Sequence, residues 1–315
     1  MLPRLDLARL PTPIEPMARL SERLGCEVWI KRDDLTGFGL SGNKVRKLEL
    51  LLAEAVESGA DTVLTCGGMQ SNHWRATALA ARRLGLRPVL LLRGPPPAVP
   101  DGNLLIDRLL GADLRTCTAE EYRDSRDEIL AGLAAEQVAQ GRVPYVIPEG
   151  GSNALGSMAF VAAAHELASQ TTDDFDAIVV AVGSGGTLAG LVLGPTPGSV
   201  VGIPVCDDRA TFVQRVAQIA PAAQRLGAPP LGDYGDGWSV VEGYQGRGYG
   251  LADRALWALI ARVAREDGVL LDPTYTGKAM AGLVGEVTAG RLGGRVLFWH
   301  TGGAFGLFGR GMEIT

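Results

Sequence analysis

The sequence predicts an α/β fold in which parallel sheets are covered by helices on both faces. Short apolar runs rich in β-branched residues alternate with helical patterns along the chain, which is the order that parallel strands and their crossover helices produce. Several of these runs end in loops of Gly, Ser and Asn that lead directly into a helix. Because ligands collect at the carboxyl ends of strands in such sheets, we expect the functional site there.

The individual elements follow one another in a regular order. Strands are predicted at residues 28–31, 62–65, 88–92, 113–115, 145–147, 177–182, 200–205 and 296–299. Helices are predicted from residue 44 to about 58, from 72 to about 84, up to 110, over roughly 119–139, and after residues 153 and 187. Pro195 and Pro197 are expected to cut the last of these short. The C-terminal third should be mainly helical until residue 296.

Two lysines open the first long helix. Asn43 is the predicted N-cap, Lys44 lies in the first turn, and Lys47 follows on roughly the same side. A cation is unfavourable at a helix N-terminus, and Lys47 and Arg46 add positive charge, so Lys44 should lose its proton easily and become a nucleophile. The alternative is an ordinary basic amphipathic helix with solvated Lys and Arg side chains. Its predicted apolar face consists of Val45, Leu48, Leu52, Ala55 and Val56.

Composition limits the class of protein. The chain has 315 residues, a formal net charge of −5 and a pI near 5.4, which argues against nucleic acid or an anionic membrane as a partner. Its first residues carry charges and lack the apolar core of a signal peptide. The cysteines are far apart, without metal-ligand spacing, so reduced thiols in a cytoplasmic protein are expected. They are Cys26, Cys66, Cys117 and Cys206.

One uncharged stretch is long enough to span a membrane but reads better as buried α/β structure. Residues 177–206 contain no charged side chain, yet they include seven glycines and three prolines. Their order indicates a strand, a Gly-rich loop, a short helix, a turn and a second strand. The loop is Gly183-Ser184-Gly185-Gly186-Thr187.

That loop is the clearest candidate for binding phosphate. Its glycines allow backbone N–H groups to converge, and its hydroxyls and the following helix N-terminus add donors. It is neither a P-loop nor a complete dinucleotide fingerprint, and a purely structural turn is the alternative. An uncharged phosphate loop together with a nucleophilic lysine far away in sequence suggests a phosphorylated aldehyde cofactor attached to that lysine.

Five motifs occur in the order found in one enzyme family. They are Gly42-Asn43-Lys44-x-Arg46-Lys47-Leu48-Glu49, Gln70-Ser71-Asn72-His73-x-Arg75, Gly150-Gly151-Ser152-Asn153, Gly183-Ser184-Gly185-Gly186-Thr187 and His300-Thr301-Gly302-Gly303. The chain resembles the pyridoxal 5′-phosphate (PLP) enzymes of fold type II, which are tryptophan synthase β-like. Within them it is similar to the group of 1-aminocyclopropane-1-carboxylate (ACC) deaminase and D-cysteine desulfhydrase. The resemblance covers nearly the whole chain.

The resemblance implies a two-domain architecture. Residues 1–46 together with 156–315 would form a large PLP-binding domain, and residues 47–155 a small α/β domain. The active site would lie in the cleft between them. The family also implies a homodimer that acts on a small amino acid.

The resemblance assigns cofactor roles to particular residues. Lys44 would carry PLP covalently and move the substrate's Cα proton. Asn72 would hydrogen-bond the ring 3′-oxygen, while the 183–187 loop and Lys47 would hold the phosphate. Thr276 and Thr301 would complete the cofactor site.

Other residues would form the substrate side. Ser71 would lie by the substrate carboxylate and take part in proton transfer, and Asn72 and His73 would adjoin it. Tyr249 and Tyr275 would line the same side. Each has a simpler alternative: Ser71 and Asn72 are good helix caps, and Tyr249 lies in a Gly-rich turn. His300 at a strand end has the alternative of simple packing.

Two positions favour one reaction over another. ACC deaminases have Glu and Leu where this chain has Thr276 and Thr301, an arrangement similar to D-cysteine desulfhydrases. A carboxylate would keep the pyridine nitrogen protonated, which opening a cyclopropane without an α-hydrogen requires. A hydroxyl suffices when an α-proton is removed and a good β-leaving group departs. β-Elimination is therefore the preferred prediction.

The expected reaction is elimination from D-cysteine to pyruvate, ammonia and sulfide. L-Cysteate or another β-substituted amino acid is the next candidate, and ACC the third. A nucleotide-binding α/β module is the alternative from a different class. Trp74 and Arg247 depart from the family pattern, and Arg247 is a candidate to receive a second anionic group of the substrate.

Overall fold

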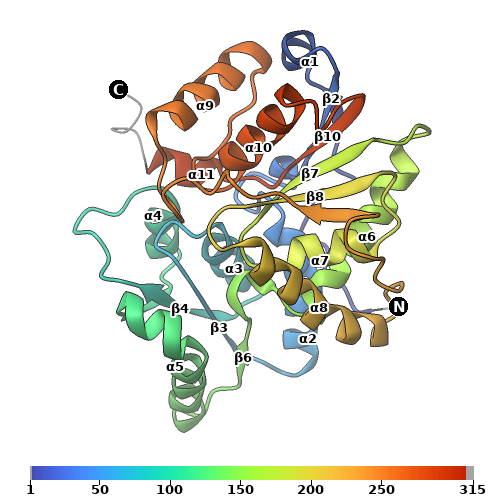
Figure 1. Cartoon of the computed structure of the whole chain (residues 1–315). Coiled ribbons are helices and arrows are strands. Elements are labelled where there is room, and N and C mark those ends of the chain that lie inside the picture. Colours follow the sequence, from blue (N-terminus) through green and yellow to red (C-terminus); the bar gives the residue numbers. More distant parts are fainter. Residues whose placement is uncertain (1, 310–315) are drawn as a thin grey trace.

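The computed structural model describes residues 2–309 and contains two β-sheets (Figure 1). A six-stranded sheet has the order β1 (Ile14–Pro16), β2 (Glu27–Arg32), β10 (Arg295–His300), β7 (Ala177–Val182), β8 (Ser199–Pro204) and β9 (Trp238–Val240). A four-stranded sheet has the order β5 (Asp113–Cys117), β4 (Arg87–Arg93), β3 (Thr62–Gly67) and β6 (Pro144–Val146). Every neighbouring pair is parallel except β1 with β2.

Helices cover both faces of the six-stranded sheet. One face packs against α1 (Ala18–Leu24), α9 (Arg254–Asp267) and α10 (Thr276–Thr288). The other packs against α6 (Ala154–Gln170), α7 (Gly186–Leu193) and α8 (Arg209–Arg225). The central strands β7 and β10 are almost entirely apolar because both of their faces are buried.

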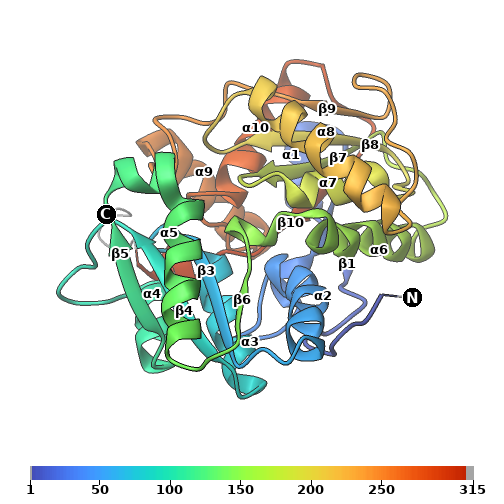
Figure 2. The same ribbon diagram turned by 90° about the horizontal axis from the view of Figure 1, so that it is seen from below.

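The four-stranded sheet is covered in the same way. Helix α5 (Ala119–Ala139) packs on one face. The other face carries α2 (Lys44–Glu57), α3 (Asn72–Arg83) and α4 (Gly102–Leu109). Figure 2 shows the two sheets in separate halves of the molecule. The remaining short elements are η1 (Asp33–Leu35), η2 (Glu149–Gly151) and α11 (Ala304–Phe308).

The predicted α/β class is confirmed, and the deviations are local. Strands β1 and β9, with three residues each, and helix α1, with seven, were not predicted because such short segments show too little periodicity. Strand β1 also makes an antiparallel edge that the prediction of parallel sheets did not contain. Helix α7 ends at Leu193, before Pro195, as expected.

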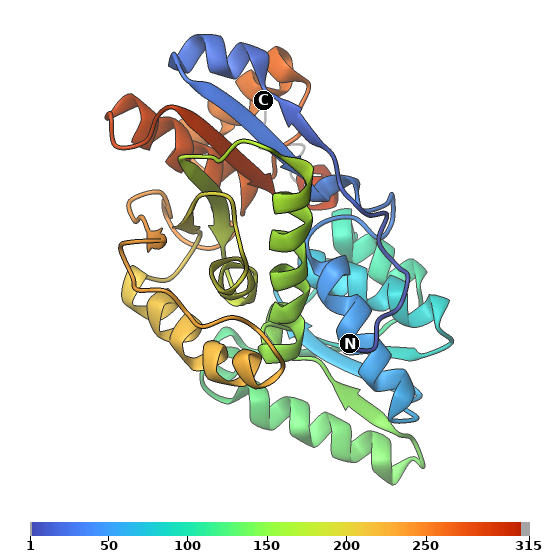
Figure 3. The ribbon, with the colours of Figure 1, turned by 90° about the vertical axis from the view of Figure 1, so that its right-hand side faces the viewer.

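Helix α2 is buried on almost all sides, which contradicts the alternative of a solvated basic helix. Arg46 and Lys47 are as buried as the apolar residues beside them. Val56, predicted on the apolar face, is instead 45% exposed in the last turn. Figure 3 shows α2 beside α6, the long helix that runs between the two halves.

The division into two domains, with boundaries after residues 46 and 155, stays a prediction. The strands of one sheet come from residues 14–32 and 177–300, and those of the other from residues 62–146. Both predicted boundaries, after residues 46 and 155, fall inside helices, namely α2 and α6. Over the described residues, no helix is long and apolar enough to cross a membrane.

Candidate active site

A cavity of about 570 Å³ lies where the carboxyl ends of strands from both sheets meet. Residues that end or directly follow β3, β4, β7, β8 and β10 line it, together with the first residues of α2, α3 and α5. This is the position at which parallel α/β sheets bind ligands. Of the predicted site residues, it brings together Lys44, Ser71, Asn72, His73, Gly183, Ser184, Gly185, Thr187, Tyr249, Tyr275 and Thr301.

Lys44 lies at the N-terminus of α2 and lines this cavity. Burial lowers the pKa of Lys44 to about 8, opposed in part by the charge of Glu149. The prediction of a lowered pKa is therefore confirmed, but its main cause is burial. No carboxylate in the described part of the chain forms an ion pair with the Lys44 ammonium. Its nearest hydrogen-bonding partner is Asn43 Oδ1, at 3.4 Å.

Asn43 precedes the helix as predicted, but its side chain does not cap it. Its Nδ2 instead donates to Thr187 Oγ1 at 3.0 Å. This hydrogen bond joins the start of α2 to the Gly-rich loop that opens α7. The amide therefore fixes Lys44 relative to the predicted phosphate loop.

Lys47 extends the same arrangement one turn further along α2. Its Nζ donates to Gly150 O at 3.2 Å and to Ser152 Oγ at 3.1 Å. Ser152 Oγ also accepts from Gly186 N and lies 2.7 Å from Ser184 Oγ. Burial, followed by the charge of Lys44, lowers the pKa of Lys47 well below its usual value.

The loop after β7 has the properties of a cradle for a phosphate group. Gly185 adopts φ +88°, which favours glycine, and it precedes the first turn of α7. A Cβ on Gly186 would lie 2.6 Å from Ser152 Oγ and 2.9 Å from Lys47 Nζ. The loop thus offers backbone N–H groups and hydroxyls, and Lys47 beside it adds an amine donor, which together suit a phosphate group. These residues fit the phosphate of PLP, although Gly186 and Lys47 do not line the cavity itself.

Ser71 caps α3, as its simpler alternative predicted, and it also lines the cavity, while its role beside the substrate carboxylate stays a prediction. Its Oγ accepts from Trp74 N at 3.3 Å. Asn72 is the first residue of α3, and its Oδ1 accepts from Asn103 Nδ2 at 3.1 Å. His73 Nε2 lies 2.9 Å from Thr65 Oγ1. Burial, and then the charges of both lysines, lower the pKa of His73 well below its usual value, so the ring is neutral.

Two tyrosines also line the cavity. Their hydroxyl oxygens, in Tyr249 and Tyr275, lie 2.7 Å apart. Burial raises the pKa of Tyr249 to about 12 and that of Tyr275 well above its usual value, so both are neutral. Lys278 Nζ donates to Gly248 O at 2.6 Å and to Val205 O at 3.1 Å. Lys278 thereby fastens the loop that carries Tyr249.

The two predicted threonines have different positions. Thr301 lines the cavity. Thr276 does not: its buried Oγ1 donates to Asp272 Oδ1 at 2.7 Å and accepts from Asp272 N. His300 is held by Leu270 O and by Gly302 N, so it has the packing role that was its simpler alternative.

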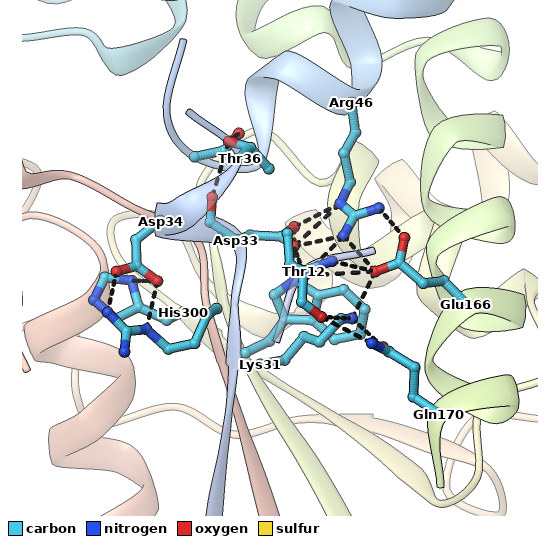
Figure 4. A network of polar contacts seen from close by, with 12 residues as sticks. Thr12, Lys31, Asp33, Asp34, Thr36, Arg46, Glu166, Gln170 and His300 are labelled. Atoms are coloured by element: carbon cyan, nitrogen blue, oxygen red, sulfur yellow. Dashed lines mark hydrogen bonds and ion pairs between the residues drawn. The ribbon is translucent and has the colours of Figure 1, made fainter. Parts of the chain in front are cut away.

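Arg46, the second residue after Lys44, does not line the cavity and lies in a buried ion network (Figure 4). Arg46 contacts Asp33 and Glu166, at 2.8 Å in each case. Lys31 Nζ lies 2.6 Å from Glu166 Oε1, and Trp299 Nε1 donates to Asp33 Oδ2 at 2.9 Å. The network ties α2 to α6, β2 and β10. It was not predicted from the sequence.

The positions that departed from the family pattern lie outside the cavity. Arg247 is exposed and Trp74 is fully buried, packed on β4 and α4. Neither lines the cavity, so the expectation that Arg247 receives a second anionic group is not supported. Arg93, which lies at the end of β4 and was not singled out, lines the cavity instead. Glu149, Tyr122 and Arg126 were also missed, because they come from two elements, η2 and α5, that only the fold brings together.

Comparison with known proteins agrees with this geometry. Residues 5–302 match the family model described as pyridoxal-phosphate dependent enzyme. The chain is 44% identical to a Thermotoga maritima protein with the provisional name 1-aminocyclopropane-1-carboxylate deaminase, over 99% of this chain and 100% of that protein. It is 43% identical to the bifunctional D-cysteine desulfhydrase/1-aminocyclopropane-1-carboxylate deaminase of Arabidopsis thaliana mitochondria, over 96% of this chain and 79% of that protein.

A solved structure described as an ACC deaminase homologue matches with a TM-score of 0.90 and 39% identity, over 99% of this chain and 95% of that one. The predicted fold and cofactor are confirmed by these matches. The chain therefore belongs to the pyridoxal-phosphate dependent enzymes, in the group that contains ACC deaminase and D-cysteine desulfhydrase.

Proposed function

We propose that this PLP-dependent enzyme is a β-eliminating lyase that converts D-cysteine and one water into pyruvate, ammonia and sulfide. The observation that carries the proposal is the cavity wall around Lys44. The lining combines an amine with a lowered pKa, neutral tyrosine hydroxyls and Thr301, not an acid, directly after β10.

Lys44 is assigned both the attachment of the cofactor and the transfer of the α-proton. PLP, when bound, withdraws electrons from the substrate's α-carbon. The Lys44 amine can accept the α-proton because its pKa of about 8 leaves a substantial unprotonated fraction near neutral pH. The backbone N–H groups at the start of α3 and the Ser71 hydroxyl are assigned to the substrate carboxylate. Tyr249 and Tyr275 close the other side as neutral hydrogen-bonding groups.

The acids near the cavity support elimination over cyclopropane opening. Asp272, close to Thr276, accepts from the backbone N–H groups of residues 274, 275 and 276 and from the Thr276 hydroxyl. Its carboxylate is therefore fully engaged in holding the start of α10. Of the acids that line the cavity, Glu149 pairs with Arg126 and Asp207 with Arg215. In the described part of the chain, this leaves no lining carboxylate unpaired to keep a pyridine nitrogen protonated.

The test compares two reaction classes on the same enzyme. Pyruvate formation from D-cysteine and β-chloro-D-alanine is measured beside 2-oxobutyrate formation from ACC. We expect kcat/KM for the elimination substrates to exceed that for ACC by at least about 10²-fold, since each factor of ten is about 1.4 kcal/mol of barrier. An equal or higher value for ACC would refute the argument from Thr301. Activity with the L-enantiomers alone would correct the assigned chirality.

We also propose that the protein acts as a cytoplasmic homodimer, as its family resemblance implies. Light scattering on the eluting holoenzyme measures the assembly directly. A mass near twice the 33.1 kDa of one chain is expected. A mass of one chain at micromolar concentration would overturn the dimer.

A further inference from the structure

We propose that Arg93 determines substrate specificity by binding an anionic group on the substrate's β-carbon, such as a sulfonate. The inference rests on the proposed β-elimination and extends it. It names substrates that carry a second acid group, with cysteate as the simplest member of the class.

Four arginines line the cavity, and three of them are already paired. Arg126 contacts Glu149 at 3.2 Å, Arg215 contacts Asp207 at 3.1 Å, and Arg123 contacts Asp124 at 2.8 Å. Arg93 has no ion pair and no side-chain hydrogen bond to any described residue. It is the one guanidinium among the described lining residues whose donors remain available to a ligand.

The structure places this free guanidinium over two aromatic rings. The Arg93 Cζ lies 5.1 Å from the centre of the Tyr249 ring and 5.7 Å from that of Tyr122. Such contacts orient the group without using its N–H donors. A planar guanidinium with free N–H groups matches carboxylate, sulfonate or phosphate oxygens in a two-pronged arrangement. The side chain is therefore prepared for an anion.

The position of Arg93 is next to the substrate side of the cavity. A Cβ on Gly68 would lie 3.7 Å from Arg93 Nη2 and 3.7 Å from the Tyr249 hydroxyl. Gly68 O accepts from Ser71 N, so the same turn joins Arg93 to the residue assigned to the substrate carboxylate. The α-carboxylate has its own donors at the start of α3. Arg93 is consequently left for a second anionic group.

The elimination of such a substrate is balanced without a further reactant. The Cβ–S bond of cysteate breaks, its electron pair leaves with sulfur as sulfite, and the α-proton moves to the Lys44 amine. Hydrolysis by one water then gives pyruvate and ammonia. Arg93 would bind the sulfonate before the bond breaks and the sulfite as it leaves.

The experiment compares an anionic and a neutral β-substituent in the holoenzyme. Steady-state kinetics with cysteate and with β-chloroalanine are measured for the wild type, Arg93→Gln and Arg93→Lys. The control is Arg247→Gln, which makes the same charge change at an exposed position outside the cavity. Binding of sulfoacetate, a non-reacting dianion, is measured beside propionate by calorimetry.

We expect Arg93→Gln to raise KM for cysteate about 10- to 100-fold, as loss of a charge-assisted hydrogen bond does. KM for β-chloroalanine should stay within about twofold, Arg93→Lys should recover part of the loss, and the control should match the wild type. Sulfoacetate binding should weaken in Arg93→Gln, with little change for propionate.

Two results would overturn the proposal. An equal loss for both substrates would assign Arg93 to the α-carboxylate or to holding Tyr249, and unchanged cysteate kinetics would remove it from the site. If the wild type eliminates from neither substrate, the proposed function has failed. Sulfoacetate binding still tests whether Arg93 binds an anionic group. Binding that depends on Arg93 would uphold its role, and binding equal in wild type and variant would reject it.

Discussion

Helix α2 presents two kinds of basic side chain on different sides, and the contrast between them separates groups that stabilise the fold from groups that serve the chemistry. On one side, Arg46 is paired with the carboxylates of Asp33 and Glu166 (Figure 4). On the other, Lys44 and Lys47 have no carboxylate partner among the described residues. Arg46 and Lys47 are buried and Lys44 is partly exposed to the cavity, yet only Arg46 has its charge balanced by carboxylates of the protein itself.

The pairing decides what each cation does. Burial alone would raise the pKa of Glu166, but its hydrogen bonds and charge interactions with Arg46 and Lys31 outweigh burial and lower that pKa to about 2. These groups stay charged and fixed. Burial lowers the pKa of Lys44 to about 8, which makes its amine reactive. A buried cation without a partner is costly to the fold, so such a group marks a site whose counter-charge is a ligand.

The largest expected effect is on catalysis. Lys44→Ala should abolish pyruvate formation, by at least about 10³-fold, because it removes both the cofactor attachment and the base. The melting temperature should change little, since the Lys44 ammonium stabilises nothing that the structure shows. Turnover and thermal unfolding are measured on the same preparation. If the variant retained more than a tenth of the activity, Lys44 would not be the catalytic amine, and the distinction between the two sides of α2 would fail.

The next effect is on stability. Arg46→Met should lower the free energy of unfolding by about 3–5 kcal/mol, because it leaves the buried Asp33 carboxylate without its cation and leaves Glu166 paired with Lys31 alone. Chemical denaturation measures it, with Arg247→Gln as an exposed control expected to stay within about 0.5 kcal/mol.

The pH dependence sharpens this prediction. Glu166 has a folded pKa below its unfolded one, so its contribution is present above about pH 4.5 and is lost as pH falls toward 2. The difference between wild type and Arg46→Met should therefore shrink in acid. A constant difference at all pH values would show that Arg46 acts through packing alone.

A smaller loss of activity is expected on substitution of Ser71, which has both a structural role as a helix cap and a proposed role toward the substrate. Ser71→Ala should reduce turnover about 10- to 100-fold and keep the bound cofactor, because the hydroxyl serves the substrate. Loss of the α3 cap should cost about 1 kcal/mol of stability. Turnover, cofactor absorbance and unfolding are compared. Loss of the cofactor would mean that the helix cap is the main role of Ser71.

The mildest test is a titration. In cofactor-free protein, the rate of PLP capture should rise about tenfold between pH 7 and 9 and then level off, because the unprotonated fraction of an amine with a pKa of about 8 saturates there. Stopped-flow absorbance measures this rate. A rate that kept rising well above pH 9 would show that Lys44 has the pKa of an ordinary lysine and that burial does not lower it.

The sequence was sufficient for the fold class, the two lysines and the phosphate loop, because these depend on local patterns. Periodicity located α5 and β7 with their exact limits, and the glycines of the 183–187 loop marked a tight turn. The family motifs then placed Ser71, Tyr249 and Tyr275 around one cavity. The nucleotide-binding alternative gave Lys44 no role and does not fit the family to which the chain belongs.

Features that depend on long-range contacts escaped prediction. Arg46 and Glu166 are 120 residues apart, and no local pattern marks them as partners. Arg93 ends an ordinary apolar strand, so only the three-dimensional arrangement separates it from Arg247, which the sequence favoured. Thr276 likewise looked equivalent to Thr301 until the structure showed its hydroxyl bound to Asp272.

The central claim is that Lys44, which lines the cavity, and not the fully buried Lys47, is the reactive amine. Borohydride reduction of the yellow holoenzyme followed by peptide mapping tests it directly. We expect one pyridoxyl group per chain, on Lys44, with none in Lys44→Ala. A pyridoxyl group on Lys47, or on neither lysine, would contradict the account.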